Sequence, residues 1–156
     1  MISERRLLIL SCSKRKCSTL RLLPAIERYN GPAFQVLRRF LREQPNKAAL
    51  LDVYILSAAY GFIRADRPIT LYDQKMIPSR ATELQPEVLT TFAEIMQNDY
   101  TCLCLVMGKT YLRALEDWEC FAPKSMKLTV ADGPMGIKLS QLKNWLWEHT
   151  KTNGDS

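Results

Sequence analysis

Apolar residues along the chain gather into short runs that alternate with segments of helical periodicity. Residues 7–10 are all leucine or isoleucine, and residues 101–107 form an almost uninterrupted apolar stretch. Runs of this kind are typical of strands that are buried on both faces of a parallel sheet. The sequence therefore predicts strands over residues 7–12, 50–56, 101–107 and 126–131.

Helical spacing of apolar positions appears between these strands. The clearest case follows Pro32, where Phe34, Leu37 and Leu41 share one helical face and three arginines fall mainly on the other. A proline suits the first turn of a helix, because the N–H group that it lacks would be unpaired there. The predicted helices cover residues 31–43, 86–97, 110–118 and 137–149. The last of these ends on the only histidine, His149, which we interpret as a surface or capping residue.

This alternation favours an α/β fold, with a mostly parallel sheet of four strands or slightly more and helices on both faces. We expect residues 1–150 to form a single domain and residues 151–156 to form a flexible tail. The segment 58–80 contains Gly61, Pro68 and Pro78. We interpret it as a long loop, and loops of this length in a compact domain are often functional.

Each predicted strand ends in a polar or glycine-containing turn. In a parallel sheet these turns lie along one edge, which is where α/β folds bind their ligands. The convergence is stronger support for a site than any single turn. The candidate ligand- or phosphate-binding residues are Ser11, Cys12, Ser13, Lys14, Arg15, Lys16, Ser57, Gly61, Tyr72, Gly108, Lys109 and Tyr111.

The segment 11–16 (SCSKRK) places hydroxyl, thiol and cationic side chains directly after a buried strand. Backbone N–H groups, hydroxyls and cations together can hold a phosphate. The segment lacks the glycines of a Walker A loop, which argues against ATP hydrolysis. The alternative interpretation is a basic surface turn.

Two residues of the 58–80 segment are the candidates for chemistry. Asp73 follows an aromatic residue and could act as a general base or position a water molecule. Tyr60 could stack on a base or donate a hydrogen bond. The structural alternatives are a capping aspartate and a tyrosine that anchors a packed turn.

The positive charge is concentrated in the N-terminal third. The whole chain carries a net charge of +6, and residues 1–47 hold 11 of the 22 Lys and Arg against 3 acidic residues, which gives 11 − 3 = +8. This asymmetry suggests a phosphate-containing or nucleic-acid partner. A merely solubilising surface is the alternative.

The cysteine spacing and the lengths of the apolar runs argue against a metalloprotein, a membrane protein and a secreted protein. The five cysteines include no C-x-x-C pair, so we expect no metal site, and no motif calls for a cofactor. No apolar run approaches the ~18–20 residues of a membrane span, and no signal peptide is evident. We therefore expect a reduced, cytoplasmic protein. The oligomeric state stays open.

Several of these segments together resemble a known family. They are residues 10–16 (LSCSKRK), 29–32 (YNGP), 55–62 (ILSAAYGF) and 72–73 (YD), with Gly108 and Tyr111 downstream. The pattern resembles a bacterial and phage domain family of unknown function. That family is distantly similar to YaaA-type peroxide-stress proteins and to uracil-DNA glycosylase-like domains. The resemblance implies an α/β sandwich and a role in base excision or exchange.

The function expected from these observations is nucleic-acid-related: a glycosylase-like enzyme that acts on a modified base in DNA or RNA. In that mechanism residues 11–16 hold a phosphate, Tyr60 or Tyr72 stacks on an extruded base, and Asp73 polarises water or stabilises charge on the sugar. One alternative is a non-catalytic DNA-binding stress-response protein. The other is an enzyme acting on a nucleotide or another phosphorylated small molecule.

Overall fold

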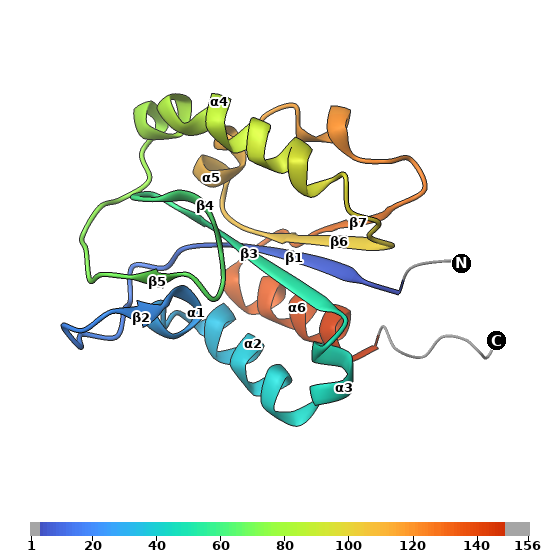
Figure 1. The fold of residues 1–156 in the computed structure, drawn as a ribbon, viewed down its shortest axis with the longest axis horizontal. Coiled ribbons are helices and arrows are strands. Elements are labelled where there is room, and N and C mark those ends of the chain that lie inside the picture. Colours follow the sequence, from blue (N-terminus) through green and yellow to red (C-terminus); the bar gives the residue numbers. More distant parts are fainter. Residues whose placement is uncertain (1–3, 149–156) are drawn as a thin grey trace.

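The computed structural model describes residues 4–148 and contains a five-stranded sheet with helices on both faces (Figure 1). Strand β1 is central and pairs in parallel with β3 and β6, β7 pairs in parallel with β6, and only β4 is antiparallel. This confirms the predicted mostly parallel α/β fold. In spatial order the strands are β4 (Gly61–Arg64), β3 (Leu51–Ser57), β1 (Arg6–Ser11), β6 (Cys102–Val106) and β7 (Lys127–Val130).

The helices form two layers (Figure 1). On one side of the sheet lie α1 (Ala25–Arg28), α2 (Pro32–Glu43), α3 (Pro45–Ala48) and α6 (Met135–Glu148). On the other lie α4 (Pro78–Ile95), α5 (Lys109–Ala114) and the 3-10 helix η1 (Trp118–Phe121). A short antiparallel pair, β2 (Leu23–Pro24) and β5 (Pro68–Ile69), extends the structure beyond the carboxyl ends of the parallel strands.

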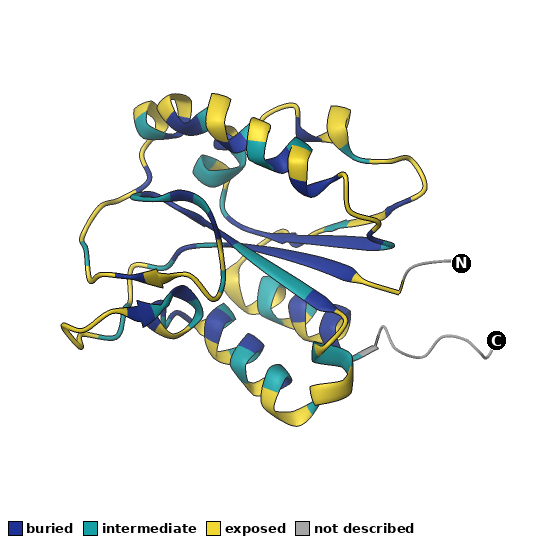
Figure 2. Ribbon diagram, viewed as in Figure 1, coloured by how far each residue is buried: buried dark blue, intermediate teal, exposed yellow. Residues whose placement is uncertain are grey.

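The core lies on both faces of the central strands (Figure 2). Leu7 to Leu10 of β1 are completely buried, and β6 is buried along its whole length. Helix α2 turns Phe34, Leu37 and Phe40 inward. These continuous apolar runs specify central strands, because each side chain of such a strand faces a helix layer whichever way it points.

The segment 58–80 differs from the prediction. It is not one long loop, because β3 turns at residues 58–60 into the antiparallel strand β4, and β5 follows. Gly61 makes this turn possible, since its φ of +73° lies in the left-handed region that favours glycine. Ile63 and Phe62 of β4 then alternate between buried and partly buried positions. The hairpin signal was therefore present, but Pro68 and Pro78, which follow β4, favoured a loop.

Helix α4 also corrects the prediction, which placed its start at Pro86. The helix begins at Pro78 and carries Pro86 in its interior. A proline inside a helix costs about 3 kcal/mol. The buried stripe continues on both sides of Pro86, with Leu84 before it and Val88 and Phe92 after it. Burying those three side chains offsets the cost, at about 1.5–3 kcal/mol each.

The other elements agree with the prediction to within a few residues, except that the helix predicted at 110–118 ends at Ala114 and is followed by η1. His149 and the predicted tail 151–156 lie outside the described residues. In the part of the chain that the structure describes, no helix is long and apolar enough to cross a membrane.

Candidate functional site

The carboxyl ends of β1, β3 and β6 meet at one edge of the sheet, as the sequence predicts. Ser11 is in register with Leu56, so that Cys12 and Ser57 follow at the same level. The chain passes from β1 to β3 on one side and later to β6 on the other. Such a crossover point leaves a crevice outside the strand ends, where ligands bind in open α/β sheets.

A pocket of about 360 Å³ lies in this crevice. We call it the crossover pocket. Its walls come from the segment after β1, the first turn of α2, the end of β6 and the first turns of α6. The lining residues are Ser11, Cys12, Ser13, Lys14, Arg15, Gly31, Pro32, Ala33, Phe34, Val106, Met107, Gly108, Met135 and Lys138.

The crossover pocket combines apolar walls with cations. Lys14 and Arg15 are exposed and, within residues 4–148, neither forms an ion pair. Lys138 donates to the Met107 carbonyl oxygen at 3.5 Å. No side chain caps the N-terminus of α2, which Gly31 opens. The pocket therefore presents positive charge that the described residues do not neutralise.

Ser13 has a structural role in this wall. Its hydroxyl donates to the Arg15 carbonyl oxygen at 2.7 Å and accepts the Gly31 N–H at 3.2 Å. The two segments approach so closely that a Cβ on Gly31 would lie 2.8 Å from the Ser13 Cβ. Ser13 and Gly31 thus shape the pocket by joining the β1 turn to the start of α2.

A second pocket of about 230 Å³ adjoins the first. We call it the Asp73 pocket, after the carboxylate at its rim. Both pockets are lined by Cys12, Ser13 and Lys14, so that these three residues form the wall between them. The other lining residues of the Asp73 pocket are Lys16, Asp73, Gln74, Lys75, Met76 and Tyr111.

Cys12 forms the shared floor of the two pockets. It is buried, its Sγ lies 3.1 Å from the Tyr111 hydroxyl, and it accepts the Ala58 N–H at 3.4 Å. Burial raises the pKa of Tyr111, and the neighbouring thiol raises it further. The Tyr111 hydroxyl is therefore neutral at physiological pH and available as a hydrogen-bond donor.

A largely buried cluster of hydroxyl groups adjoins the Asp73 pocket through Tyr72, the residue before Asp73. The Tyr29 hydroxyl donates to Ser57 Oγ at 3.0 Å and lies 2.6 Å from the Tyr72 hydroxyl, which is itself 3.0 Å from Ser57 Oγ. Ser57 Oγ also accepts the N–H groups of Ala59 and Tyr60. The Lys16 ammonium lies 4.6 Å from the centre of the Tyr72 ring. Ser57 and Tyr72 therefore do not line the pocket, and Tyr72 contacts it through the lining residue Lys16.

This cluster predicts a loss of stability at high pH. Burial raises the pKa of Tyr29 to about 12 and also raises that of Tyr72. An unfolded tyrosine ionises near pH 10, so between about pH 10 and 12 the unfolded chain loses protons that the folded chain retains. Stability must then fall as pH rises through this window. Urea unfolding at pH 8 and pH 11 should show the decrease, and Tyr29→Phe with Tyr72→Phe should make it smaller, since only the raised pKa values of Tyr100 and Tyr111 then remain. An unchanged slope in that double variant would contradict the assignment.

The other predicted site residues lie outside the two pockets or form their edges. Gly108 lines the crossover pocket and opens α5, whereas the exposed Lys109 lines neither pocket. Gly61 belongs to the β3–β4 turn. Tyr60 also lies outside the pockets, and its hydroxyl is 2.8 Å from Thr70 Oγ.

Much of the basic N-terminal third is structural rather than ligand-binding. Arg6 donates to the carbonyl oxygens of Trp145 and Leu146, and Arg38 donates to those of Ile26 and Tyr29. Arg28 is completely buried. The charge pattern alone could not separate these arginines from Lys14 and Arg15. The pocket contributions of Phe34, Met135 and Lys138 were also missed, since nothing local marks them.

Comparisons with known proteins give a family but no function. Among curated proteins, none matches the chain. A model of DUF6884, a family of unknown function, matches residues 7–144. The match runs from the first core residue of β1 into the last helix and includes every residue that lines the two pockets. The chain therefore belongs to the DUF6884 family.

Proposed function

We propose that the protein binds a nucleotide unit, with its phosphate at the crossover pocket, and hydrolyses the N-glycosidic bond of that unit next to Asp73. The observation that carries the proposal is the adjacency of the two pockets across Cys12–Lys14. One pocket offers cations and apolar walls, and the other offers a carboxylate. A ligand with a phosphate at one end and a reactive sugar–base bond at the other would span both.

The phosphate end is suited to the segment after β1. Lys14 and Arg15 are the exposed cations there, and Lys138 approaches from α6. The first turn of α2 lines the same space, and the positive end of a helix dipole favours an anion. A phosphate at this position would neutralise charge that has no carboxylate partner among the described residues.

The remainder of the ligand is suited to the apolar walls. Phe34, Met107 and Met135 provide surface against which a base or sugar can pack. The volume of 360 Å³ lies within the ~300–1,000 Å³ of typical small-molecule sites.

The proposed reaction uses the exposed Asp73 carboxylate. The bond between the sugar C1′ and the base nitrogen breaks, and its electron pair leaves with the base. The positive charge that develops on the sugar is stabilised by the negative Asp73. A water oxygen then bonds to C1′ while the carboxylate takes a proton from that water. This proton passes to the departing base, so that the products are a free sugar hydroxyl and a neutral base.

The resemblance of the sequence segments to uracil-DNA glycosylase-like domains supports hydrolysis of an N-glycosidic bond as the class of reaction. The same geometry would also serve a protein that binds nucleotides without cleaving them. The lysines in the Asp73 pocket, Lys14, Lys16 and Lys75, favour an anionic ligand in either case.

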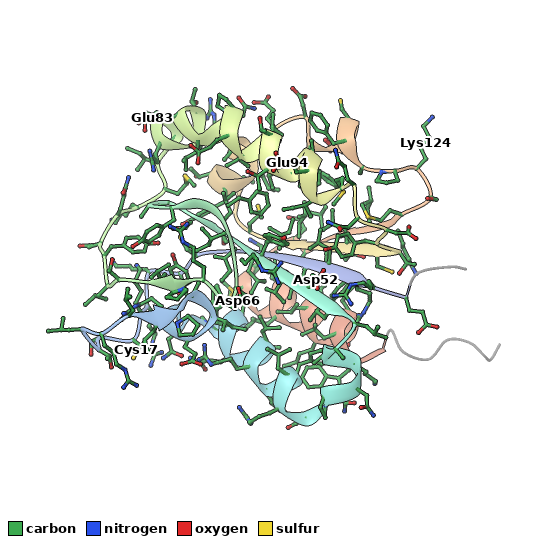
Figure 3. All side chains as sticks on the ribbon, viewed as in Figure 1. Cys17, Asp52, Asp66, Glu83, Glu94 and Lys124 are labelled. Atoms are coloured by element: carbon green, nitrogen blue, oxygen red, sulfur yellow. The ribbon has the colours of Figure 1, made fainter. Side chains whose placement is uncertain are left out.

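Titration calorimetry with nucleoside monophosphates tests the binding step. The variant Lys14→Ser/Arg15→Ser should bind about 10²–10⁴-fold more weakly, because charge-assisted hydrogen bonds contribute ~1.5–3 kcal/mol each and the variant loses two of them. The matched control is Lys124→Ser/Lys127→Ser, which removes equal charge from a distant edge, where Figure 3 labels Lys124. A parent chain that binds no monophosphate, or equal losses in both variants, would refute the site.

A further inference from the structure

A projecting loop between β1 and β2 exposes two leucines. Leu20 is 86% exposed and Leu22 is 61% exposed, the highest values for large hydrophobic residues in the described part of the chain. Figure 1 shows the loop extending past β2, at the sheet edge where the parallel strands end. Figure 3 labels Cys17 in the same region, next to α1. Two solvent-exposed leucines at the proposed binding edge are suited to insertion into a partner, because insertion would bury their apolar surface.

The loop is held in one conformation by a buried cation. The Arg28 guanidinium donates at 2.7 Å to each of the carbonyl oxygens of Cys17 and Thr19, and at 2.6 Å to that of Arg21. Arg28 itself is completely buried. Its hydrogen bonds fix the backbone on both sides of Leu20. The entropic cost of ordering the loop when a partner binds is therefore small.

The Arg28 guanidinium also connects the loop to strand β5 and, through it, to Tyr60 and Arg67. It also donates to the Ile69 carbonyl oxygen of β5 at 3.3 Å. The next residue, Thr70, places its Oγ 2.8 Å from the Tyr60 hydroxyl. The Arg67 guanidinium lies 5.0 Å from the centre of the Tyr60 ring.

We call the surface formed by the exposed Leu20, Arg21, Leu22 and Arg67, together with the half-buried Tyr60, the ridge. It combines apolar side chains, an aromatic ring and two guanidinium groups. Bases stack on aromatic rings and on guanidinium planes, apolar side chains wedge between bases, and cations hold the phosphates between them. The ridge also continues through Leu71 and Tyr72 to the Asp73 pocket.

We infer that the ridge binds single-stranded nucleic acid that flanks the nucleotide held in the two pockets. The inference rests on the proposed function, because it takes the pocket ligand to be one unit of a strand. It adds the class of substrate: a nucleotide within a polymer rather than a free one. An aromatic ring paired with guanidinium is suited to base stacking, whereas a membrane surface would call for a broader apolar face.

Fluorescence anisotropy with labelled single-stranded DNA and RNA of ~16 nucleotides, enough for one site, tests the ridge. We expect Leu20→Ser/Leu22→Ser to weaken oligonucleotide binding about 10-fold, because the apolar surface that the two leucines would bury against the bases is lost. Mononucleotide binding should be unchanged. The control is Phe121→Ser/Leu128→Ser, which removes two exposed apolar side chains on η1 and β7.

A second variant tests the phosphate contact. Arg21→Ser should lower the slope of log K against log salt concentration by about 0.7, the value for one phosphate contact in a single strand. This measurement does not depend on the leucines. A slope unchanged by Arg21→Ser, together with oligonucleotide affinity within twofold of the parent in Leu20→Ser/Leu22→Ser, would overturn the inference.

The outcomes separate the two proposals. Monophosphate binding that survives while the ridge variants have no effect on oligonucleotides would refute the ridge alone. Leucine-dependent oligonucleotide binding without base release would uphold the ridge and refute the reaction. Binding to phosphatidylserine vesicles that requires Leu20, with no leucine-dependent oligonucleotide binding, would replace nucleic acid by a lipid surface as the partner.

Discussion

Asp73→Asn is expected to slow base release by ~10²–10⁴-fold, the range that a positioned general base contributes. Asparagine keeps the shape of the side chain but can neither accept a proton from water nor carry the negative charge that stabilises the sugar cation. Asp73 is exposed at the rim of its pocket, and it belongs to none of the ion pairs among the described residues. Monophosphate affinity should therefore stay close to that of the parent.

The measurement is the release of free base from nucleotide and single-stranded substrates, followed by chromatography. Asp66→Asn is the matched control: it removes an exposed carboxylate from the same segment, one that pairs with Arg64 at 3.4 Å and lines neither pocket. The role of Asp73 fails if its variant releases base within threefold of the parent, or if the control loses as much.

Arg28→Met is expected to lower the free energy of unfolding by about 3–5 kcal/mol, because several backbone carbonyl oxygens lose their hydrogen-bond donor. Methionine fills much of the same volume but has no N–H groups. The carbonyl oxygens of Cys17, Thr19, Arg21 and Ile69 would lose their donor together. An unsatisfied buried polar group costs about 1–3 kcal/mol, and rearrangement of the exposed loop relieves part of that sum.

Urea unfolding at neutral pH measures the effect, with Arg42→Met as the control. Arg42 is exposed on α2, and surface substitutions of this kind change stability by ~0.5 kcal/mol or less. If both variants unfold at the same urea concentration, Arg28 does not hold the loop. If Arg28→Met is destabilised and its loop becomes mobile, the variant should also bind single strands more weakly. That result would show that Arg28 positions the leucines of the ridge.

Most of the sheet could be predicted from the sequence because its signals are local. Four apolar runs identified the parallel strands, although the edge strand β7 is largely exposed, and the polar ends of these runs identified the edge where both pockets lie. The prediction missed the edge strand β4 because it is short and because Pro68 and Pro78 follow it closely. Pro86 misplaced the start of α4, since the local cost of proline was outweighed by long-range burial that a sequence window does not contain.

The sequence by itself determined the fold class, the edge of the sheet where both pockets lie, and Lys14, Arg15 and Asp73 as candidates at that edge. Only the tertiary structure decided what each polar side chain does there. Arg28 has the same charge as Arg15, yet one is buried against carbonyl oxygens and the other is exposed. Tyr29 and Tyr72 are far apart in sequence and meet at one serine. The reason is physical: burial and hydrogen-bond partners are properties of neighbours in space, and residue type and periodicity specify only neighbours along the chain.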